Sequence, residues 1–473
     1  MIKYTYTLNN GEFISKAVTI AFTFLIITFF RRTVTIPYGL MEDDGYFYAQ
    51  IAYNIGVNGI SSFDGINITD GYHLLWCWML SGITFFVSFF TLNKNIHLFF
   101  YILFQLLIIS FVTLKASKQN VATAFTLFSF FLFGNLLMDT VILAVFLLYL
   151  SFNEESRFRY LFFFFIPLTR IDATVILFPI LAYSLLKERK EFVKIFAALS
   201  FGVLLHFISI YHLSGEFFTV SSVLKTEKSM DIINNIITNF TVHSRAFFRV
   251  STLFLTIIAG LTASFNRKKI NNSFLIVCGL IIFYSAHLSL GMMRSWYFVP
   301  GVVVGFSVFC KYRKNNIFHN LIFYSTVFLA LFHTSARIWV YISLNEESKQ
   351  ANIFIEEIKK NVPENELVFQ YDASGFTGYF SERRVINGDG LVNTHEYARR
   401  LVNGKLEGYL EENDICYIID NYKISDRPIV DVGGLIVKRD ELELIFGERD
   451  KCPYPMTCFS LYKLRSGRCS GNR

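Results

Sequence analysis

The feature that most constrains this chain is a series of apolar segments separated by short polar loops. The segments are Ile14–Phe30, Leu74–Thr91, Ile96–Leu114, Val121–Leu136, Thr140–Phe152, Phe158–Leu168, Ala173–Leu186, Phe192–His212, Ala246–Ala263, Ser273–Leu290, Trp296–Cys310 and Ile317–Ile342. Several are short for a hydrocarbon core about 30 Å thick. The pattern still predicts a polytopic α-helical membrane protein, and 53% hydrophobic residues argue against a soluble domain.

The Lys and Arg residues indicate how these segments cross the membrane. They cluster in short loops: Lys115–Lys118, Arg157–Arg159, Lys187–Lys190 with Lys194, Arg267–Lys269 and Lys311–Lys314. Short loops rich in Lys and Arg stay on the cytoplasmic side. The net charge of +7 therefore indicates topology and not a nucleic-acid-binding surface.

The alternation of these loops requires that only one of the first two segments after Asp70 crosses the membrane. We assign the crossing to Ile96–Leu114. We expect Leu74–Thr91, which begins with two tryptophans, to lie in the interface or to re-enter. The prediction is about eleven transmembrane helices, with the N-terminus inside and the C-terminus outside. Arg31 and Arg32 fall on the outer side, against the usual bias.

This topology brings the unusual polar residues together at the outer membrane face. They are Asp43, Asp44, Asp139, Arg170, Asp172, Lys225, Arg294 and Tyr297. The first two directly follow the first apolar segment, and the aromatic residues after them suit the interface. A negative charge so close to a membrane is costly unless it has a task. The clustering predicts one polar site, with the first outer loop, residues 31–95, as a catalytic platform.

From about Asn345 the chain becomes polar, and no further apolar segment follows. We expect residues 1–344 to form the transmembrane catalytic domain and residues 345–473 to form a small extracytoplasmic α/β domain. Its predicted helices are Ala351–Lys360, Glu396–Val402 and Lys405–Glu412, and its predicted strands are Leu367–Tyr371, Arg384–Asn387, Cys416–Asp420 and Gly434–Lys438. Cys452 and Cys458 are candidates for a disulfide in an oxidising compartment.

A set of motifs in a fixed order carries a resemblance to a known family. They are Asp43-Asp44-Gly45-Tyr46, Phe63-Asp64-Gly65, Thr69-Asp70-Gly71-Tyr72-His73, Leu137-Met138-Asp139-Thr140, Leu168-Thr169-Arg170-Ile171-Asp172, Ser221-Ser222-Val223-Leu224-Lys225, Arg294-Ser295-Trp296-Tyr297, Gly375–Phe380 and Asn387–Asn393. With them the chain resembles the GT-C superfamily of glycosyltransferases, polytopic enzymes that use polyprenyl-phosphate-linked sugars. It departs from that family at Asp139, where the family has Glu, and at Leu74, where Pro commonly follows the His.

The resemblance implies roles for the polar residues. Asp43 would be the base that takes the proton of the acceptor hydroxyl, a task suited to a carboxylate, with Asp44 as its partner or second acid. Arg170, Lys225 and Arg294 would stabilise the departing phosphate. The other expected substrate-binding residues are His73, Asp139, Asp172 and Tyr297. The two adjacent acids could instead bind a divalent cation such as Mg²⁺ or Mn²⁺, and the sequence leaves this open.

Each residue also has a structural interpretation. Asp43 and Asp44, and likewise Asp139, could cap the helix that follows. Arg170 and Asp172 could form an ion pair at a helix end, and His73 could be a hydrogen-bonding residue of the interface. The remaining alternatives are lipid headgroups as partners of Lys225 and Arg294, an aromatic-belt position for Tyr297, and simple turns at Gly375–Phe380 and Asp389–Asn393.

The sequence thus predicts a glycosyltransferase at the outer face of a bacterial-type cytoplasmic membrane. It would pass a sugar from a polyprenyl-phosphate donor to a cell-envelope glycan, lipid or protein, without nucleic acid as a partner. A transporter of polyprenyl-linked lipids or glycans is an alternative, but its charges would lie near the membrane midplane. An oligosaccharyltransferase would carry a Trp-Trp-Asp element, which is absent. A non-enzymatic envelope assembly protein is a further alternative.

Overall fold

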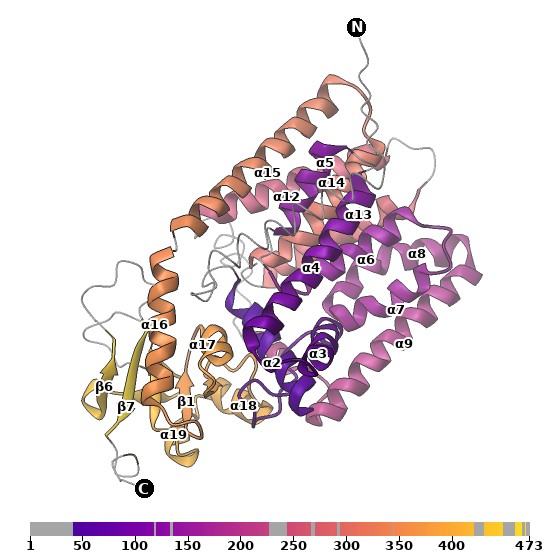
Figure 1. Ribbon diagram of the computed structural model, residues 1–473. Helices are drawn as coiled ribbons and strands as arrows, with labels where there is room; N and C mark the ends of the chain where they lie inside the picture. The colour runs from indigo at the N-terminus through magenta and orange to yellow at the C-terminus, as the bar shows by residue number, and fades with distance from the viewer. Residues whose placement is uncertain are drawn as a thin grey trace.

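Long helices form most of the structure, a computed structural model that describes residues 41–117, 120–132, 136–226, 244–265, 270–290, 294–343, 345–420, 430–447, 459–465 and 469. The predictions for Ile14–Phe30, Arg31, Arg32, Arg267–Lys269, Cys452 and Cys458 lie outside these residues. Figure 1 shows a helical bundle with a small sheet domain at one end. Helix α16 (Asn345–Asn361) leads from the last bundle helix to the sheet.

The apolar segments of the sequence become the helices of the bundle. These are α4 (Lys94–Ser117), α5 (Val121–Leu132), α6 (Thr140–Phe152), α7 (Arg159–Thr169), α8 (Phe178–Lys187), α9 (Arg189–Ser214), α12 (Ser244–Phe265), α13 (Asn272–Leu290), α14 (Phe298–Tyr312) and α15 (Ile317–Ser343). The segment predicted at Ala173–Leu186 is instead divided into a 3₁₀ helix, η1 (Asp172–Leu177), and α8. The mostly helical architecture with a small sheet domain is confirmed.

Three of the described helices contain a stretch long and apolar enough to cross a membrane. The stretches are Lys94–Ala116, Arg189–Ser214 and Asn272–Ser289, and the other apolar helices of the described residues are shorter. The predicted crossing at Ile96–Leu114 is therefore matched by a helix of sufficient length. The prediction of about eleven transmembrane helices is not confirmed.

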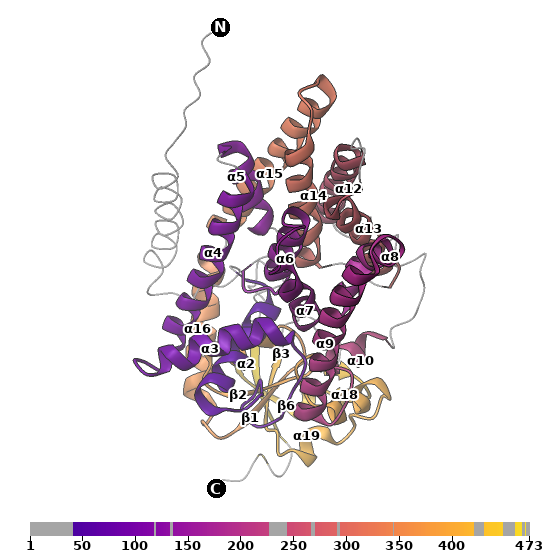
Figure 2. The same cartoon turned by 90° about the vertical axis from the view of Figure 1, so that its right-hand side faces the viewer.

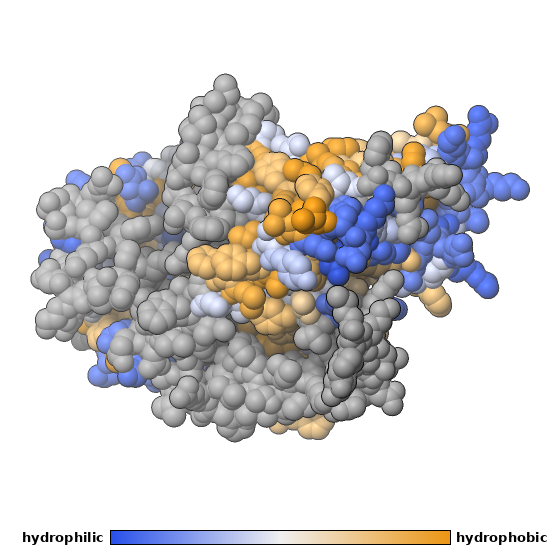
Figure 3. Space-filling model, turned by 90° about the horizontal axis from the view of Figure 1, so that it is seen from above, coloured by the Kyte–Doolittle hydropathy of each residue, from blue (hydrophilic) through white to orange (hydrophobic). Residues whose placement is uncertain are grey.

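The outer surface of the bundle is apolar. Helix α9 exposes Phe196, Phe201, Leu204 and Ile208, each with more than half of its side chain accessible (53%, 61%, 54% and 54%). Seen from above in Figure 3, hydrophobic residues cover the middle of the described surface, and hydrophilic residues gather at the right-hand end. Contiguous apolar surface of this kind marks contact with a partner or with lipid. Together with the apolar helices, it indicates a membrane protein.

Two helices lie across the end of the bundle that faces the sheet (Figure 2): α2 (Asp43–Asn58) and α3 (Leu74–Ser88). With 15 residues, α3 is shorter than a membrane-crossing helix. It packs against α2, and its end exposes Phe86, Phe89 and Phe90. Phenylalanine side chains suit the apolar face of a helix that lies on a membrane. Whether Leu74–Thr91 lies in the interface or re-enters remains a prediction.

The basic loops lie at the opposite end of the bundle. Arg159 pairs with Glu191 across the loops beside α7 and α9, with Nη2 and Oε1 2.5 Å apart. The backbone N–H of Asn272, at the start of α13, donates to Glu154 in the same group of loops. Helix α4 begins beside the sheet domain, where Lys94 Nζ donates to the carbonyl of Tyr379, so Lys115 lies at its far end. These described loops therefore share one end, as predicted.

The sheet domain contains one five-stranded sheet and a separate hairpin. The sheet has the order β2 (Arg384–Asn387), β1 (Leu367–Gln370), β3 (Tyr417–Asp420), β7 (Ser460–Leu464) and β6 (Leu442–Phe446). Strands β1, β2 and β3 are parallel, whereas β7 runs antiparallel to both of its neighbours. The hairpin joins β4 (Val430–Val432) to β5 (Leu435–Val437). The helices of the domain are α17 (Ser374–Phe380), α18 (His395–Val402) and α19 (Tyr409–Glu412).

Several features of this domain differ from the sequence prediction. Gly375–Phe380, interpreted as a turn, is helix α17, because its two glycines let it pack tightly against α2 and Phe63. The helix predicted at Lys405–Glu412 begins only at Tyr409, after Gly408, whose φ is 75°. Strands β4, β6 and β7 were not predicted. The structure also contains a disulfide between Cys416 and Cys469. The turn predicted for Asp389–Asn393 is present.

The sheet domain and the bundle share one hydrophobic core. Tyr46 of α2 contacts Phe376 and Phe380 of α17, with ring centroids 5.5 and 5.7 Å apart. The buried residues of α2, α3 and the bundle are continuous with those of α16, α17 and β1. Because buried apolar contact dominates such interfaces, the sheet domain is held in a defined position against the end of the bundle.

Candidate active site

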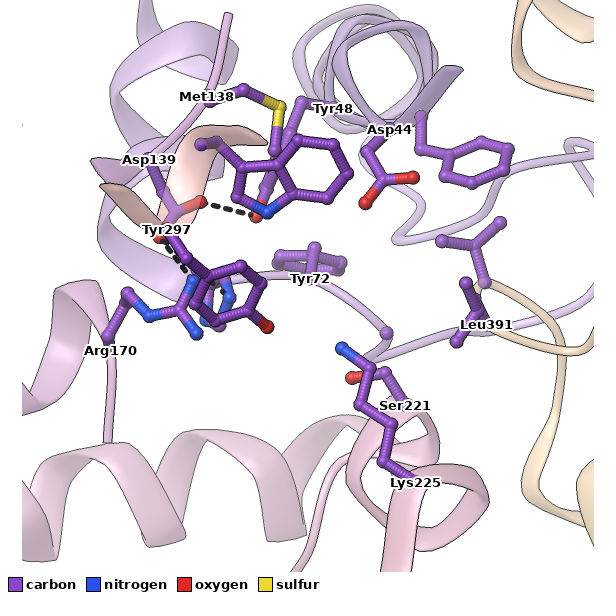
Figure 4. A pocket seen from close by; sticks show the side chains of 15 residues that line it. Asp44, Tyr48, Tyr72, Met138, Asp139, Arg170, Ser221, Lys225, Tyr297 and Leu391 are labelled. Carbon is purple, nitrogen blue, oxygen red and sulfur yellow. Dashed lines mark hydrogen bonds and ion pairs between the residues drawn. The ribbon is translucent and has the colours of Figure 1, made fainter. Parts of the chain in front are cut away.

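A pocket lies where α2, the loops before α3 and α6, helix α10 (Val220–Thr226) and a loop of the sheet domain meet (Figure 4). It has about 500 Å³ of empty space, including its open mouth. It is lined by Asp44, Phe47, Tyr48, Gly71, Tyr72, His73, Met138, Asp139, Arg170, Ser221, Lys225, Trp296, Tyr297, Leu391 and Val392. Of the predicted site residues, Asp43, Asp172 and Arg294 are not part of this lining. The predicted roles remain predictions.

Asp44 is the carboxylate of α2 that faces the pocket (Figure 4). Burial raises its pKa above the usual range, while the positive charges of Lys225 and Arg294 act in the opposite direction. Within the described part of the chain, its carboxylate has no hydrogen bond or ion pair with another residue. A carboxylate with free lone pairs and a raised pKa is suited to accept a proton from a bound hydroxyl.

Asp43 points to a different neighbour, because adjacent residues of a helix do not share a face. Its carboxylate accepts hydrogen bonds from the backbone nitrogens of Gly375 and Phe376, at 3.0 and 3.1 Å. These groups belong to the first turn of α17, whose N–H groups have no partner within that helix. Burial nevertheless raises the pKa of Asp43 well above its usual range. Asp43 therefore caps α17 of the sheet domain and not α2.

A strained turn presents Asp139. Leu137 has a φ of 63°, which is uncommon for a residue with a side chain. Trp76 Nε1 donates to the Leu137 carbonyl (2.7 Å), and the Leu137 N–H donates to Gln105 Oε1 (2.7 Å). The Asp139 side chain makes no cap hydrogen bond to α6. Two buried polar side chains thus hold the turn that directs this carboxylate toward the pocket.

Arg170 is buried and forms ion pairs with two acidic residues. It binds Asp172 through Nε and Nη2, at 3.0 and 2.7 Å, and its Nη1 lies 3.3 Å from Asp139 Oδ2. His287 Nε2 also lies 3.1 Å from Asp172. The ring of Tyr297 covers the guanidinium, 4.6 Å away. The ion pair considered from the sequence is therefore present, and we call Asp139, Arg170, Asp172 and His287 the paired cluster.

His73 lies beside the paired cluster. Its Nε2 is 3.8 Å from Asp139 Oδ2, and its ring stacks on that of Tyr48. Burial lowers the pKa of His73 to about 4, so its imidazole is neutral at physiological pH. Tyr48 donates to Asp139 Oδ1 at 3.3 Å. These contacts give His73 a hydrogen-bonding role in the wall of the pocket.

Lys225 and Arg294 differ from Arg170 in having no acidic partner in contact. Lys225 extends from α10 toward the pocket, opposite Asp44 (Figure 4). Arg294 is exposed at the start of η2 (Ser295–Tyr297), and its charge acts on Asp44. No ion pair joins either cation to the described residues. They are positive charges available to an anionic ligand.

Two acidic residues near the pocket were not predicted as site residues. Asp389 follows β2 in the sheet domain. Burial, and to a smaller extent the negative charge of Asp44, raises the pKa of Asp389 to about 7. Asp70 is fully buried and binds α9, α10 and the sheet domain. Both stand beside glycine in motifs already noted, so an acid in a glycine-rich turn was the available signal. The hydrogen bonds of Asp70, and the effect of Asp44 on Asp389, come from segments far away in sequence, which periodicity does not reveal.

The predicted divalent cation has no assembled site among the described residues. No group of three or more His, Cys, Asp or Glu side chains in these parts of the chain is arranged to hold a metal ion. Asp43 and Asp44, the pair considered as ligands, direct their carboxylates to different neighbours. The dependence on Mg²⁺ or Mn²⁺ remains a prediction.

Comparison with known proteins gives a remote likeness to solved structures. No family model matches the sequence, and no curated protein matches it. Among solved structures, the chain is similar to the apo crystal structure of an oligosaccharyltransferase of Archaeoglobus fulgidus, with a TM-score of 0.49 and 13% sequence identity. The match covers 89% of this chain and 70% of that chain. A likeness this remote supports no residue role.

Proposed function

We propose that the protein is a membrane glycosyltransferase that moves a sugar from a polyprenyl-phosphate donor to a hydroxyl of a cell-envelope glycan, lipid or protein. One observation carries the proposal. At the end of an apolar bundle, Asp44, a carboxylate without a contact partner among the described residues, faces Lys225 across a pocket. This arrangement provides a proton acceptor and a cation for an anionic leaving group, beside a surface suited to lipid.

In the proposed reaction, Asp44 is the base, in place of Asp43. The acceptor oxygen attacks the anomeric carbon and gives its proton to the Asp44 carboxylate. The bond between that carbon and the phosphate oxygen breaks, and the phosphate leaves with the electron pair. The raised pKa of Asp44 supports this role, because a base works best when its pKa lies near the working pH. Asp43 is less suited, since both of its oxygens accept backbone hydrogen bonds.

The departing phosphate would be bound by Lys225 and Arg294. Both are cations without an acidic partner in contact within the described chain, so an anion does not have to displace a carboxylate. Arg170 is already neutralised by Asp139 and Asp172. We assign the paired cluster the role of shaping the pocket wall, where it holds Tyr48, His73 and Tyr297 in place.

The proposed orientation puts the pocket and the sheet domain outside a bacterial-type cytoplasmic membrane. The basic loops at the opposite end support this, because such loops remain on the cytoplasmic side. The disulfide between Cys416 and Cys469 agrees with an oxidising compartment. The donor would then reach the pocket from the outer leaflet.

The test uses the purified protein in lipid nanodiscs with a panel of radiolabelled polyprenyl-phosphate sugars. We expect turnover of one donor by the wild type and its loss in Asp44→Asn. Asp43→Asn is the matched control, because it removes a carboxylate from the adjacent residue. We expect it to lower the thermal unfolding midpoint and to leave turnover per folded molecule nearly unchanged. Full activity of Asp44→Asn would rule out the assigned base. Movement of intact donor across the bilayer of sealed proteoliposomes would indicate a transporter instead.

A further inference from the structure

The carboxylate of Asp70 lies outside the pocket, but it contacts the first residue of α10, the helix that carries Lys225. Asp70 is fully buried in the loop before α3. Its Oδ1 accepts from the backbone nitrogen of Val220 at 2.8 Å. Its Oδ2 accepts from Ser214 Oγ at 2.7 Å and from His395 Nε2 at 2.9 Å. One carboxylate therefore joins the last residue of α9, the first residue of α10 and the first residue of α18.

Helix α10 depends on such contacts, because a helix of seven residues is not stable alone. Val220 and Leu224, one turn apart, are buried against Ala398 of α18. Ser221 and Lys225 follow them by one residue each and line the pocket. The packing of Val220 and Leu224 on the sheet domain therefore fixes the position of α10 and, with it, the direction of the Lys225 side chain.

The backbone around Asp70 leaves little room for adjustment. A Cβ added at Gly71 would lie 1.9 Å from the carbonyl oxygen of Leu391, so the loop of the sheet domain packs directly on the main chain there. Leu391 also lines the pocket and packs against the cluster formed by Val220 and Leu224. Asp70, Gly71 and α10 are therefore held by the same part of the sheet domain.

We propose that Asp70, together with His395 of the sheet domain, is a positioning residue that holds α10 so that Lys225 reaches the donor phosphate. This inference rests on the proposed function for the identity of the ligand. Its structural content, that the sheet domain sets the position of Lys225 through a buried carboxylate, does not. The sheet domain is then a part of the donor site and not only a platform for the acceptor.

The kinetic test is a double-mutant cycle with the full chain in nanodiscs. Asp70→Asn and His395→Leu each remove a partner from a buried hydrogen bond, and we expect each to raise the donor KM by about tenfold. We expect the acceptor KM to stay unchanged. In the Lys225→Met background the same changes should have almost no further effect, because the amine that they position is gone. Effects that add to those of Lys225→Met would overturn the inference.

Two further variants separate positioning from loss of folding. His395→Gln retains an N–H donor and should recover most of the donor affinity that His395→Leu loses. Arg399→Gln breaks the ion pair of Arg399 with Glu216, which joins the same two segments but is exposed on both sides (57% and 41%). Exposed pairs contribute little, so this control should leave the donor KM unchanged. A loss in Arg399→Gln equal to that in His395→Leu would contradict a specific role for Asp70.

Hydrogen exchange of residues 215–226 gives a readout that does not depend on turnover. We expect protection in the wild type and in Arg399→Gln, and loss of protection in Asp70→Asn and His395→Leu. Unchanged protection in both of these variants would overturn the inference even if the protein transfers sugar. Absence of turnover by the wild type with every donor, together with the expected exchange pattern, would reject the proposed function and leave the positioning of α10 intact.

Discussion

The two sides of the pocket use their charges in opposite ways. On one side, the paired cluster of Asp139, Arg170, Asp172 and His287 satisfies a buried cation with two carboxylates. On the other side, Asp44 and Lys225 face the pocket without a contact partner among the described residues. We call these two residues the open pair. We infer that the charges already neutralised maintain the pocket wall, whereas the open pair is available to a ligand.

Removal of the carboxylate of the open pair should have the largest effect. We expect Asp44→Asn to lower turnover by about a thousandfold, since a general base contributes 10²–10⁴-fold. Its thermal stability should not fall, because the carboxylate makes no contact that folding requires. Turnover in nanodiscs and the unfolding midpoint of the same sample measure both effects. A large loss of stability with normal turnover would place Asp44 with the structural residues.

The paired cluster should show the reverse behaviour. Arg170→Met leaves the buried Asp139 and the partly exposed Asp172 without their cation. Breaking a buried pair in this way costs about 3–5 kcal/mol. We expect a large fall in the thermal unfolding midpoint. The matched control is Arg400→Met, which removes an exposed arginine paired with Glu396 and Glu412; its midpoint should change little. Equal midpoints for the two variants would contradict a supporting role for the cluster.

The cation of the open pair should affect binding more than stability. We expect Lys225→Met to raise the donor KM by about tenfold through the loss of one charge-assisted contact. The free energy of unfolding should change by no more than about 0.5 kcal/mol, as for most surface substitutions. Lys225→Arg keeps the charge and should retain part of the affinity. A drop in stability comparable to that of Arg170→Met would remove the distinction between the two sides.

The last prediction concerns the pH dependence contributed by Asp389. Burial raises its folded-state pKa to about 7, whereas the unfolded value is about 3.9. The folded protein therefore binds this proton more tightly than the unfolded chain does. Its contribution to stability is fully present below about pH 4 and is lost as the pH rises through about 7. Unfolding midpoints between pH 4 and 8 should fall less steeply in Asp389→Asn; identical slopes would exclude this contribution.

The outline of the fold followed from apolar periodicity. The bounds of α6 coincide with the predicted Thr140–Phe152, and those basic loops that the structure describes lie together, because hydrophobic length and charge bias are local properties of the chain. The wrong predictions also have a physical reason. Gly375–Phe380 contains two glycines and therefore suggested a turn, but contacts with Asp43 and Phe63 stabilise it as a helix.

For the site, charge and apolar patterning predicted which polar residues gather at one end of the bundle. The contacts of each residue became known only from the folded arrangement. Asp43 and Asp44 are adjacent residues of the same type, yet the rotation of α2 directs Asp43 to the backbone of α17 and Asp44 to the pocket. Likewise, Asp70 meets its partners at residues 214, 220 and 395 only after folding. Such contacts depend on distances between remote segments, which no local pattern in the sequence records.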